Sequence, residues 1–167
     1  MASSTFGICS YCGEKFSKMR IKKHLDQCEK RKISNNDEEQ DYFCISVQGY
    51  YNKEYWLYIS VSATVTLKSL DRFLRDIWLE CCGHLSSFRI NGVDYDSSLE
   101  DCFGSKSMNI KAGQVLYEGL EFVHEYDFGT PTTLKLKVIA LSRAKKRKKS
   151  IELMARNVQP QIKCSCC

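Results

Sequence analysis

The chain has 167 residues, of which 43% are hydrophobic, and carries a formal net charge of +5. This length accommodates one substantial core and a small appendage. There is no run of about eighteen apolar residues to span a membrane, and residues 1–6 lack the pattern of a secretory signal, so we expect an intracellular, cytoplasmic protein with no membrane partner. In that reducing compartment the ten cysteines are expected to bind metal or pack as thiols rather than form disulfides.

The positive charge is concentrated at the two ends of the chain. Residues 1–32 carry eight Lys or Arg against three Asp or Glu, residues 33–142 carry nine against sixteen, and residues 143–167 carry eight against one. A polyanionic partner would therefore be held by the ends rather than by the middle.

Residues 1–32 are predicted to form a zinc finger. A helix over residues 18–30, with Ser17 as its N-cap, would place a His and a Cys at i and i+4 on one face, opposite a Cys-x-x-Cys knuckle. The four candidate ligands are Cys9, Cys12, His24 and Cys28. Such a set is typical of structural Zn²⁺, which would supply much of the folding free energy of so short a segment.

The spacing of the finger also carries a resemblance. The Cys-x-x-Cys pair, the gap of eleven residues and His24-Leu25-Asp26-Gln27-Cys28 are similar to the ubiquitin-binding zinc fingers of DNA-repair proteins. In those fingers an Asp between the last two ligands helps to hold ubiquitin, so the resemblance implies a role for Asp26 in binding ubiquitin or a ubiquitin-like domain. Comparable spacing occurs in fingers that bind nucleic acid, which leaves both partners open.

The next segments predict a linker, two strands and a helix. Residues 33–41 are polar and predict a flexible linker. Two runs rich in aromatic and β-branched residues, 43–47 and 56–61, predict strands joined by a hairpin. Thr66 then caps an amphipathic helix whose apolar positions recur every three or four residues as far as Cys81, which we interpret as a core thiol.

The second half of the chain predicts further strands. Asn91-Gly92, between two short apolar runs, predicts a β-hairpin. Residues 120–128 alternate as a half-buried strand, with His124 on the apolar face as a packed, hydrogen-bonded side chain, and a turn leads into a last strand over residues 134–138. The order of elements predicts an α+β fold, a mainly antiparallel sheet with one main helix, similar to a β-grasp.

Three motifs follow one another in this region: Trp78 to Phe88, a hairpin containing Tyr95, and Glu125-Tyr126-Asp127-Phe128-Gly129. In this order they make residues 42–141 similar to the Ri-plasmid Orf3-like family, also described as insertion-element passenger proteins of TnpR type. The resemblance implies a fold and a mobile-element context but no activity. Where the family continues with an acid, a Trp and a His, this chain has Thr130-Pro131-Thr132-Thr133, so a site formed by those family residues would be incomplete here.

Residues 142–167 form a basic segment that ends in a cysteine knuckle. Its cationic run predicts a solvated linker, the polar end of a helix that continues into residues 151–154, a nuclear address or a phosphate contact. The side chains assigned to a nucleic-acid partner are Lys145, Lys146, Arg147, Lys148 and Lys149.

The remaining cysteines leave a second metal site open. The C-terminal Cys-x-x-Cys is interpreted first as the truncated start of a zinc ribbon. Its thiols could instead be free, or they could share an ion with residues at the end of the main helix. The candidate ligands of this second site are Cys82, His84, Cys164 and Cys167.

Together these features predict a non-enzymatic zinc-binding protein. Its segments would be a finger, a linker, an Orf3-like domain and a basic segment with a knuckle, at residues 1–32, 33–41, 42–141 and 142–167. The leading expectation is association with nucleic acid in a mobile-element or regulatory context. An adaptor for ubiquitin or a ubiquitin-like domain is the alternative, and a metal-dependent enzyme that uses Cys82, His84 or Asp127 is the third.

Overall fold

The computed structural model describes residues 5–31, 37–77, 83–98 and 104–157. Two α-helices lie within these ranges, α1 (Lys18–Gln27) and α2 (Leu67–Ile77). The strands are β1 (Phe6–Cys9), β2 (Lys15–Ser17), β3 (Glu39–Gly49), β4 (Trp56–Ser62), β5 (Ser86–Ile90), β6 (Val93–Asp96), β7 (Lys106–Ser107), β8 (Glu121–Tyr126), β9 (Thr132–Lys145) and β10 (Ile151–Asn157).

All ten strands belong to one mixed sheet, in the order β2-β1-β10-β4-β3-β9-β8-β5-β6-β7. Neighbouring strands are antiparallel except β6 and β7. The predicted hairpin at Asn91-Gly92 is confirmed, with φ of 50° and 77° at its two residues, as a tight hairpin turn requires. A mainly antiparallel sheet with one main helix is therefore confirmed, and the likeness to a β-grasp stays a prediction.

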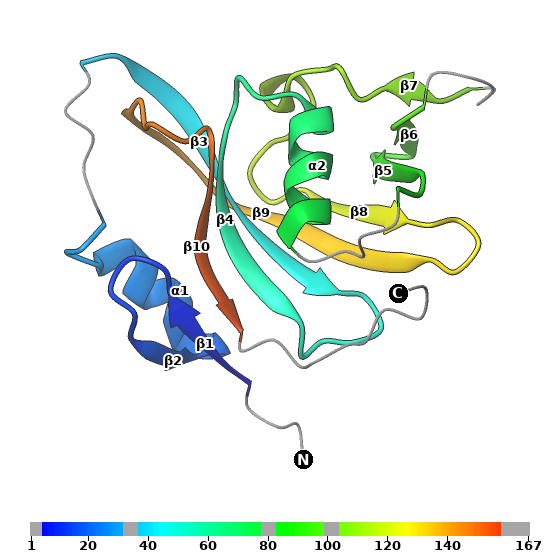
Figure 1. Ribbon diagram of the computed structural model, residues 1–167. Coiled ribbons are helices and arrows are strands. Elements are labelled where there is room, and N and C mark those ends of the chain that lie inside the picture. Colours follow the sequence, from blue (N-terminus) through cyan, green and yellow to red (C-terminus); the bar gives the residue numbers. More distant parts are fainter. Residues whose placement is uncertain (1–4, 32–36, 78–82, 99–103, 158–167) are drawn as a thin grey trace.

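The main core lies between α2 and one face of the sheet (Figure 1). Thr66 caps α2 as predicted, because its Oγ1 accepts a hydrogen bond from Ser69 N at 3.2 Å. The helix buries Leu67, Leu70 and Leu74 completely. The sheet residues beneath include alternate positions of β3, β4 and β9, namely Ile45, Val47, Leu57, Ile59, Val61, Leu134, Leu136 and Val138.

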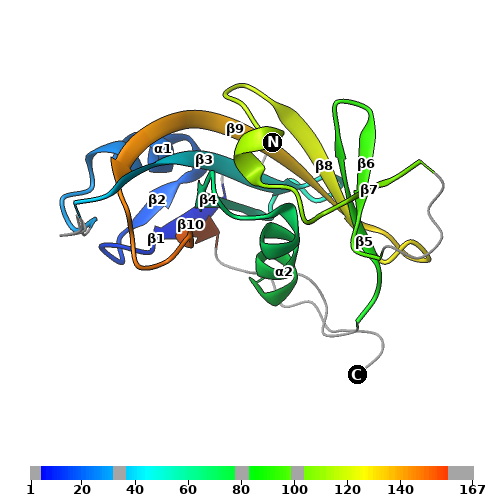
Figure 2. The same cartoon turned by 90° about the horizontal axis from the view of Figure 1, so that it is seen from above.

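A second, smaller core covers the opposite face of the same sheet. All seven residues of β4 are buried, because α2 covers one side of the strand and the finger covers the other (Figures 1 and 2). Trp56 and Tyr58 point away from α2 and pack with Met154 of β10 against Ile21 and Leu25 of α1. The finger therefore has no separate core. It shares one with the sheet.

Two predictions about the connecting segments are corrected. Residues 39–41, expected in the linker, are the first residues of β3. Residues 151–154, for which a helix was one alternative, belong to β10, which pairs with β4 on one side and with β1 on the other. Ile151 and Leu153 pack toward the α2 core, whereas Met154 and Ala155 pack toward the finger, where the register with β4 shifts at a bulge.

One ionisable pair lies inside the main core. His124 on β8 is fully buried, and its Nε2 is 2.7 Å from Oδ1 of Asp71 on α2, which confirms the predicted hydrogen-bonded histidine. Burial alone would raise the pKa of Asp71, but the hydrogen bond from His124 and the nearby charge of Arg75 outweigh it, and the pKa lies below its usual value. The pair connects α2 to β8 within the main core.

We expect Asp71→Asn to lower the free energy of unfolding at pH 7 by about 3 kcal/mol, because it leaves His124 with a neutral partner in the core. The folded-state pKa is depressed, so the contribution of Asp71 is present above about pH 4 and is lost as the pH falls through the folded-state value. Urea unfolding at pH 7 and pH 3 measures both effects.

The matched control is Asp76→Asn on the same helix, where the side chain is 74% exposed and faces Arg72 at 4.0 Å. This variant should change the free energy of unfolding by less than about 0.5 kcal/mol at either pH. Equal losses for the two variants would contradict the assignment of Asp71 as the buried ionised partner.

Candidate metal centre

The first two cysteines lie on a closed turn. Cys9 is the last residue of β1. Its N–H donates to Glu14 O at 3.0 Å, and Gly13 N–H donates to Cys9 O at 2.9 Å. Gly13 has a φ of +78°, a left-handed conformation that favours glycine. The turn folds Cys12 back beside Cys9, which is the predicted knuckle.

The other two candidate ligands come from α1. His24 lies in its last turn and Cys28 is its C-cap residue. The ring of Phe16 on β2 stacks on the His24 imidazole, with centroids 4.0 Å apart and planes at 21°, and so fixes the orientation of the ring. Ser17 occupies the N-cap position as predicted but makes no side-chain capping hydrogen bond; Lys18 N–H donates to Thr5 O at 3.1 Å instead.

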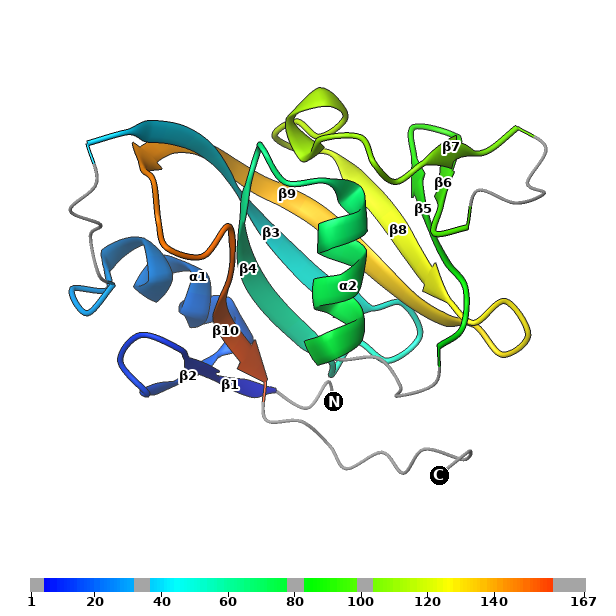
Figure 3. The ribbon, with the colours of Figure 1, turned by 45° about the horizontal axis from the view of Figure 1, so that its top comes forward.

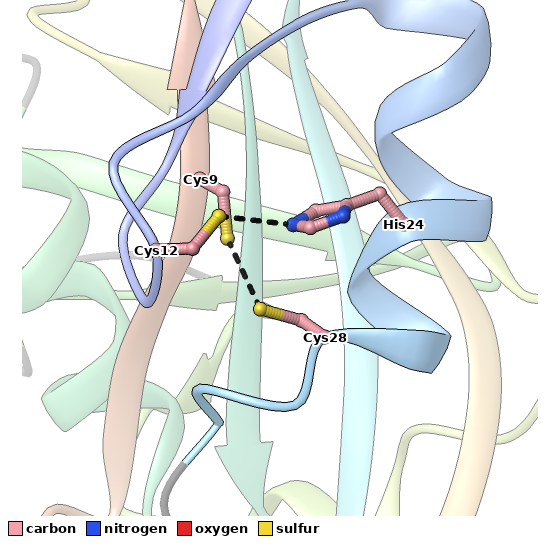
Figure 4. A group of neighbouring side chains, drawn as sticks. All are labelled: Cys9, Cys12, His24 and Cys28. Atoms are coloured by element: carbon pink, nitrogen blue, oxygen red, sulfur yellow. Dashed lines mark hydrogen bonds between the residues drawn. The ribbon is translucent and has the colours of Figure 1, made fainter.

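The four side chains converge on one point (Figure 4). Their ligand atoms all lie within 4.8 Å of one another. Sγ of Cys9 is 3.9 Å from Sγ of Cys28, and Sγ of Cys12 is 3.3 Å from Nε2 of His24. Tetrahedral coordination with bonds of about 2.3 Å to sulfur and 2.0 Å to nitrogen would give roughly 3.8 and 3.5 Å for such distances. The cluster can therefore hold a metal ion.

The environment of the sulfur atoms determines how binding depends on pH. Cys9 is fully buried, and burial raises the pKa of its thiol to about 11, although the N–H groups of Cys12 and Tyr11 act in the opposite direction. Without metal the thiol is neutral at pH 7. Because a metal binds the thiolate, binding must release protons and should strengthen as the pH rises.

The sheet supports the knuckle through Trp56. The finger backbone passes directly over the indole at Gly7, where an added Cβ would overlap Cη2 of the ring. Trp56 Nε1–H donates to Thr5 Oγ1 at 2.8 Å, and Ser10 N–H donates to Met154 O at 2.9 Å. The position of the knuckle relative to the sheet is thus set by direct contacts on both sides of β10.

A polar chain makes a second connection between knuckle and sheet. Tyr11 O–H donates to Oε2 of Glu152 at 3.0 Å, and Arg147 Nη1 lies 3.4 Å from the same oxygen and 2.7 Å from Ser60 Oγ. Burial, followed by the charge of Glu152, raises the pKa of Tyr11 to about 12. Arg147, assigned from the sequence to nucleic acid, is instead a half-buried side chain that links β4 and β10.

The rest of the basic run largely faces carboxylates of the chain itself. β9 extends as far as Lys145, so the first part of the run is strand rather than solvated linker. The ion pairs are Arg143 with Glu39 and Asp41 at 3.3 and 3.6 Å, Lys145 with Asp37 at 3.8 Å, and Lys146 with Glu38 at 2.8 Å. Lys148 and Lys149 are exposed and form no ion pair with any described residue.

The remaining predicted site residues are not assembled into a second centre by the described part of the chain. Asp26 is exposed on α1. His84 Nδ1 lies 3.9 Å from Asp127 Oδ1, which also accepts a hydrogen bond from Gly129 N–H at 3.1 Å. Cys81, Cys82, Cys164 and Cys167 lie outside the described residues, so the second metal site stays a prediction.

The residues that sequence reasoning missed are those that hold the finger on the sheet. Trp56, Tyr58 and Met154 were not predicted to contact it, nor was Arg147 expected to be half-buried. The sequence does contain one indication of this contact, because residues 56–59, Trp-Leu-Tyr-Ile, are apolar at every position rather than at alternate positions. Such a run is typical of a strand covered on both faces.

Comparison with known proteins supplies a fold but no function. No protein-family model and no curated protein matches the chain. A crystal structure of a protein of unknown function, MM3350 from Methanosarcina mazei Go1, superimposes with a TM-score of 0.63, covers 70% of each chain and is 16% identical. At this identity the likeness shows the fold alone, and the Orf3-like relationship stays a prediction. No helix of the described residues has the length and apolar character to cross a bilayer.

We expect the purified chain to contain one metal ion at the finger and Cys28→Ser to lose it. Cys44→Ser is the matched control, because Cys44 on β3 packs against the small core under the finger but is not one of the four candidate ligands. Metal content by plasma mass spectrometry distinguishes the two variants. Equal metal content in both would contradict the ligand assignment.

We further expect removal of the metal to release the finger from Trp56. In a Trp78→Phe background Trp56 is the only one of the two tryptophans left, so its emission reports the contact. Treatment with a chelator should shift this emission to the red, because the indole loses the cover of Gly7 and α1. The Cys28→Ser variant should show the shifted spectrum before any chelator is added, whereas an unchanged spectrum in both cases would contradict the coupling.

Proposed function

We propose that the chain is a zinc-stabilised, non-enzymatic protein that binds nucleic acid. Three thiolates and one imidazole at tetrahedral distances form a ligand set that favours Zn²⁺ over the harder divalent cations. All four coordination positions would be filled by the protein, so the ion would have no open position for a water or a substrate. This supports a structural role for the metal and a binding role for the protein.

The distribution of unpaired positive charge carries the nucleic-acid proposal. Residues 5–31 contain seven Lys or Arg and three Asp or Glu. Among the described residues, none of these seven cations forms an ion pair, whereas the cations of the basic run from Arg143 to Arg147 all face carboxylates. Phosphates bind best where cations are exposed and not already neutralised. We therefore assign the main phosphate-binding surface to the finger rather than to the basic run.

The test compares two pairs of lysines. Lys22→Ala/Lys23→Ala removes two exposed, unpaired cations of α1, and Lys145→Ala/Lys146→Ala removes two that face Asp37 and Glu38. Both variants change the net charge equally. The first should weaken binding of labelled DNA and RNA and reduce the slope of log K against log salt by about one for each phosphate that is no longer neutralised.

The second variant should bind as the unmodified chain does, measured by fluorescence anisotropy at two salt concentrations. Equal weakening by the two variants would show that net charge alone matters and would contradict the assignment to the finger. The absence of any binding at low salt would remove the nucleic-acid proposal altogether.

Recognition of ubiquitin or a ubiquitin-like domain is the second candidate. It is supported by the exposed surface of α1, where Met19 is 92% exposed and Asp26 lies two turns further along the same side of the helix. An exposed large apolar side chain and an acid on one side of a helix are features of protein-binding surfaces and add nothing to phosphate binding.

If this candidate holds, Asp26→Ala should weaken binding of labelled ubiquitin by about tenfold. Glu29→Ala is the matched control, because Glu29 is also an exposed acid of the finger but lies beyond the end of α1. Titrations followed by NMR or anisotropy would separate them. Identical curves for the two variants, or no binding by the unmodified chain, would eliminate the adaptor role.

A further inference from the structure

Two neighbouring tyrosines project from the loop between β3 and β4. Tyr50 is 49% exposed and Tyr51 is 84% exposed, and their rings meet edge to face with centroids 5.0 Å apart. Figure 3 shows this loop at the same end of the sheet as the loop between β8 and β9. Tyrosines of a compact domain normally bury most of their ring, so two adjacent exposed rings indicate a binding surface.

The loop that carries the tyrosines is held by its own hydrogen bonds. Gly49 N–H donates to Tyr55 O at 2.9 Å, and Tyr55 N–H donates to Asn52 O at 3.2 Å. Tyr50 N–H donates across to Thr133 O of β9 at 2.9 Å. The backbone of the loop that carries the two tyrosines is therefore already ordered before a ligand binds, which lowers the entropic cost of binding.

Two cations without carboxylate partners border the tyrosines. Lys18, the first residue of α1, donates from Nζ to Gln48 Oε1 at 2.7 Å, two residues before Tyr50. Burial, followed by repulsion from Lys53 on the hairpin loop, lowers the pKa of Lys18. No described carboxylate forms an ion pair with either lysine, so the two charges lie close together and unneutralised.

Two further features define the charge of this surface. The first turn of α1 contains no acidic residue, so its positive helix end adds to the field of Lys18. Lys135, which faces Gln48 across the β3–β9 pair, is already neutralised by Glu121 at 2.8 Å. The attraction for an anion is therefore centred on Lys18 and Lys53.

We infer that the hairpin surface, defined as Lys18, Tyr50, Tyr51 and Lys53, binds single-stranded nucleic acid, with bases stacked on the tyrosines and phosphates against the lysines. Exposed aromatic rings beside cations match unpaired bases and their backbone, whereas the bases of a duplex are stacked inside and cannot reach the rings. The inference rests on the proposed function and narrows it to single strands.

The test uses Tyr50→Ala/Tyr51→Ala and, as matched control, Tyr117→Ala, which removes a tyrosine of similar exposure (53%) outside the hairpin surface. The probes are a fluorescein-labelled oligothymidine and a DNA duplex of the same length, followed by anisotropy at two salt concentrations. The double variant should lose about tenfold or more in affinity for the single strand, with the salt slope and the affinity for duplex unchanged.

Lys53→Ala should weaken both probes and reduce the salt slope by about one, because it removes a cation that neutralises a phosphate. Tyr117→Ala should bind as the unmodified chain does. Since Tyr51 is almost fully exposed, Tyr51→Ala alone supplies a variant whose fold does not depend on the substitution, and it should show part of the same loss.

The measurements distinguish failure of the stacking surface from failure of the proposed function. Unchanged single-strand binding in the tyrosine variants, together with weakened binding in Lys22→Ala/Lys23→Ala, would overturn the stacking surface and leave the nucleic-acid proposal in place. Failure of the unmodified chain to bind either probe at low salt would overturn the proposed function and the stacking surface with it.

Discussion

β4 lies between two apolar layers, and both must be present for the sheet to be covered. Leu57, Ile59 and Val61 meet α2, while Trp56 and Tyr58 meet the finger. Burial of apolar surface is the dominant favourable term in folding, so loss of either layer would expose a continuous apolar face. A metal ion at the knuckle would therefore stabilise the finger and also the outer face of the sheet, even though the ion contacts no residue of β4.

The cations from Arg143 to Arg147 are paired with carboxylates of the chain, whereas those in the described part of the finger are not. The acidic residues 37–41 lie beside the basic run because β3 and β9 are antiparallel neighbours, which brings Glu39 opposite Lys145. Surface ion pairs of this kind contribute little to stability, but they do reduce the field that a polyanion would meet. The finger has no such acidic neighbour among the described residues, and its positive field faces solvent.

The finger and the hairpin surface are connected through the first residue of α1. Lys18 belongs to the finger helix, yet its hydrogen bond with Gln48 places its charge beside the β3–β4 loop. A nucleic acid bound at the first turn of α1 would thus lie near the loop that carries Tyr50 and Tyr51. The metal, the docking on Trp56 and the hairpin surface would then act as one binding unit, in which the finger positions the cations and the sheet supplies the aromatic rings.

What the sequence by itself determined are the features that depend on short windows. The ligands Cys9, Cys12, His24 and Cys28 follow from a tight turn and an i, i+4 pair, and the amphipathic period of α2 is read within eleven residues. Only the tertiary structure decided that β10 joins β4 to β1 and pairs Gly7 with Asn157, that the finger docks on Trp56, and that Arg147 is half-buried. Such pairings join residues far apart in the chain, and no local hydrogen bond or periodicity specifies which sheet edge a distant strand will complete.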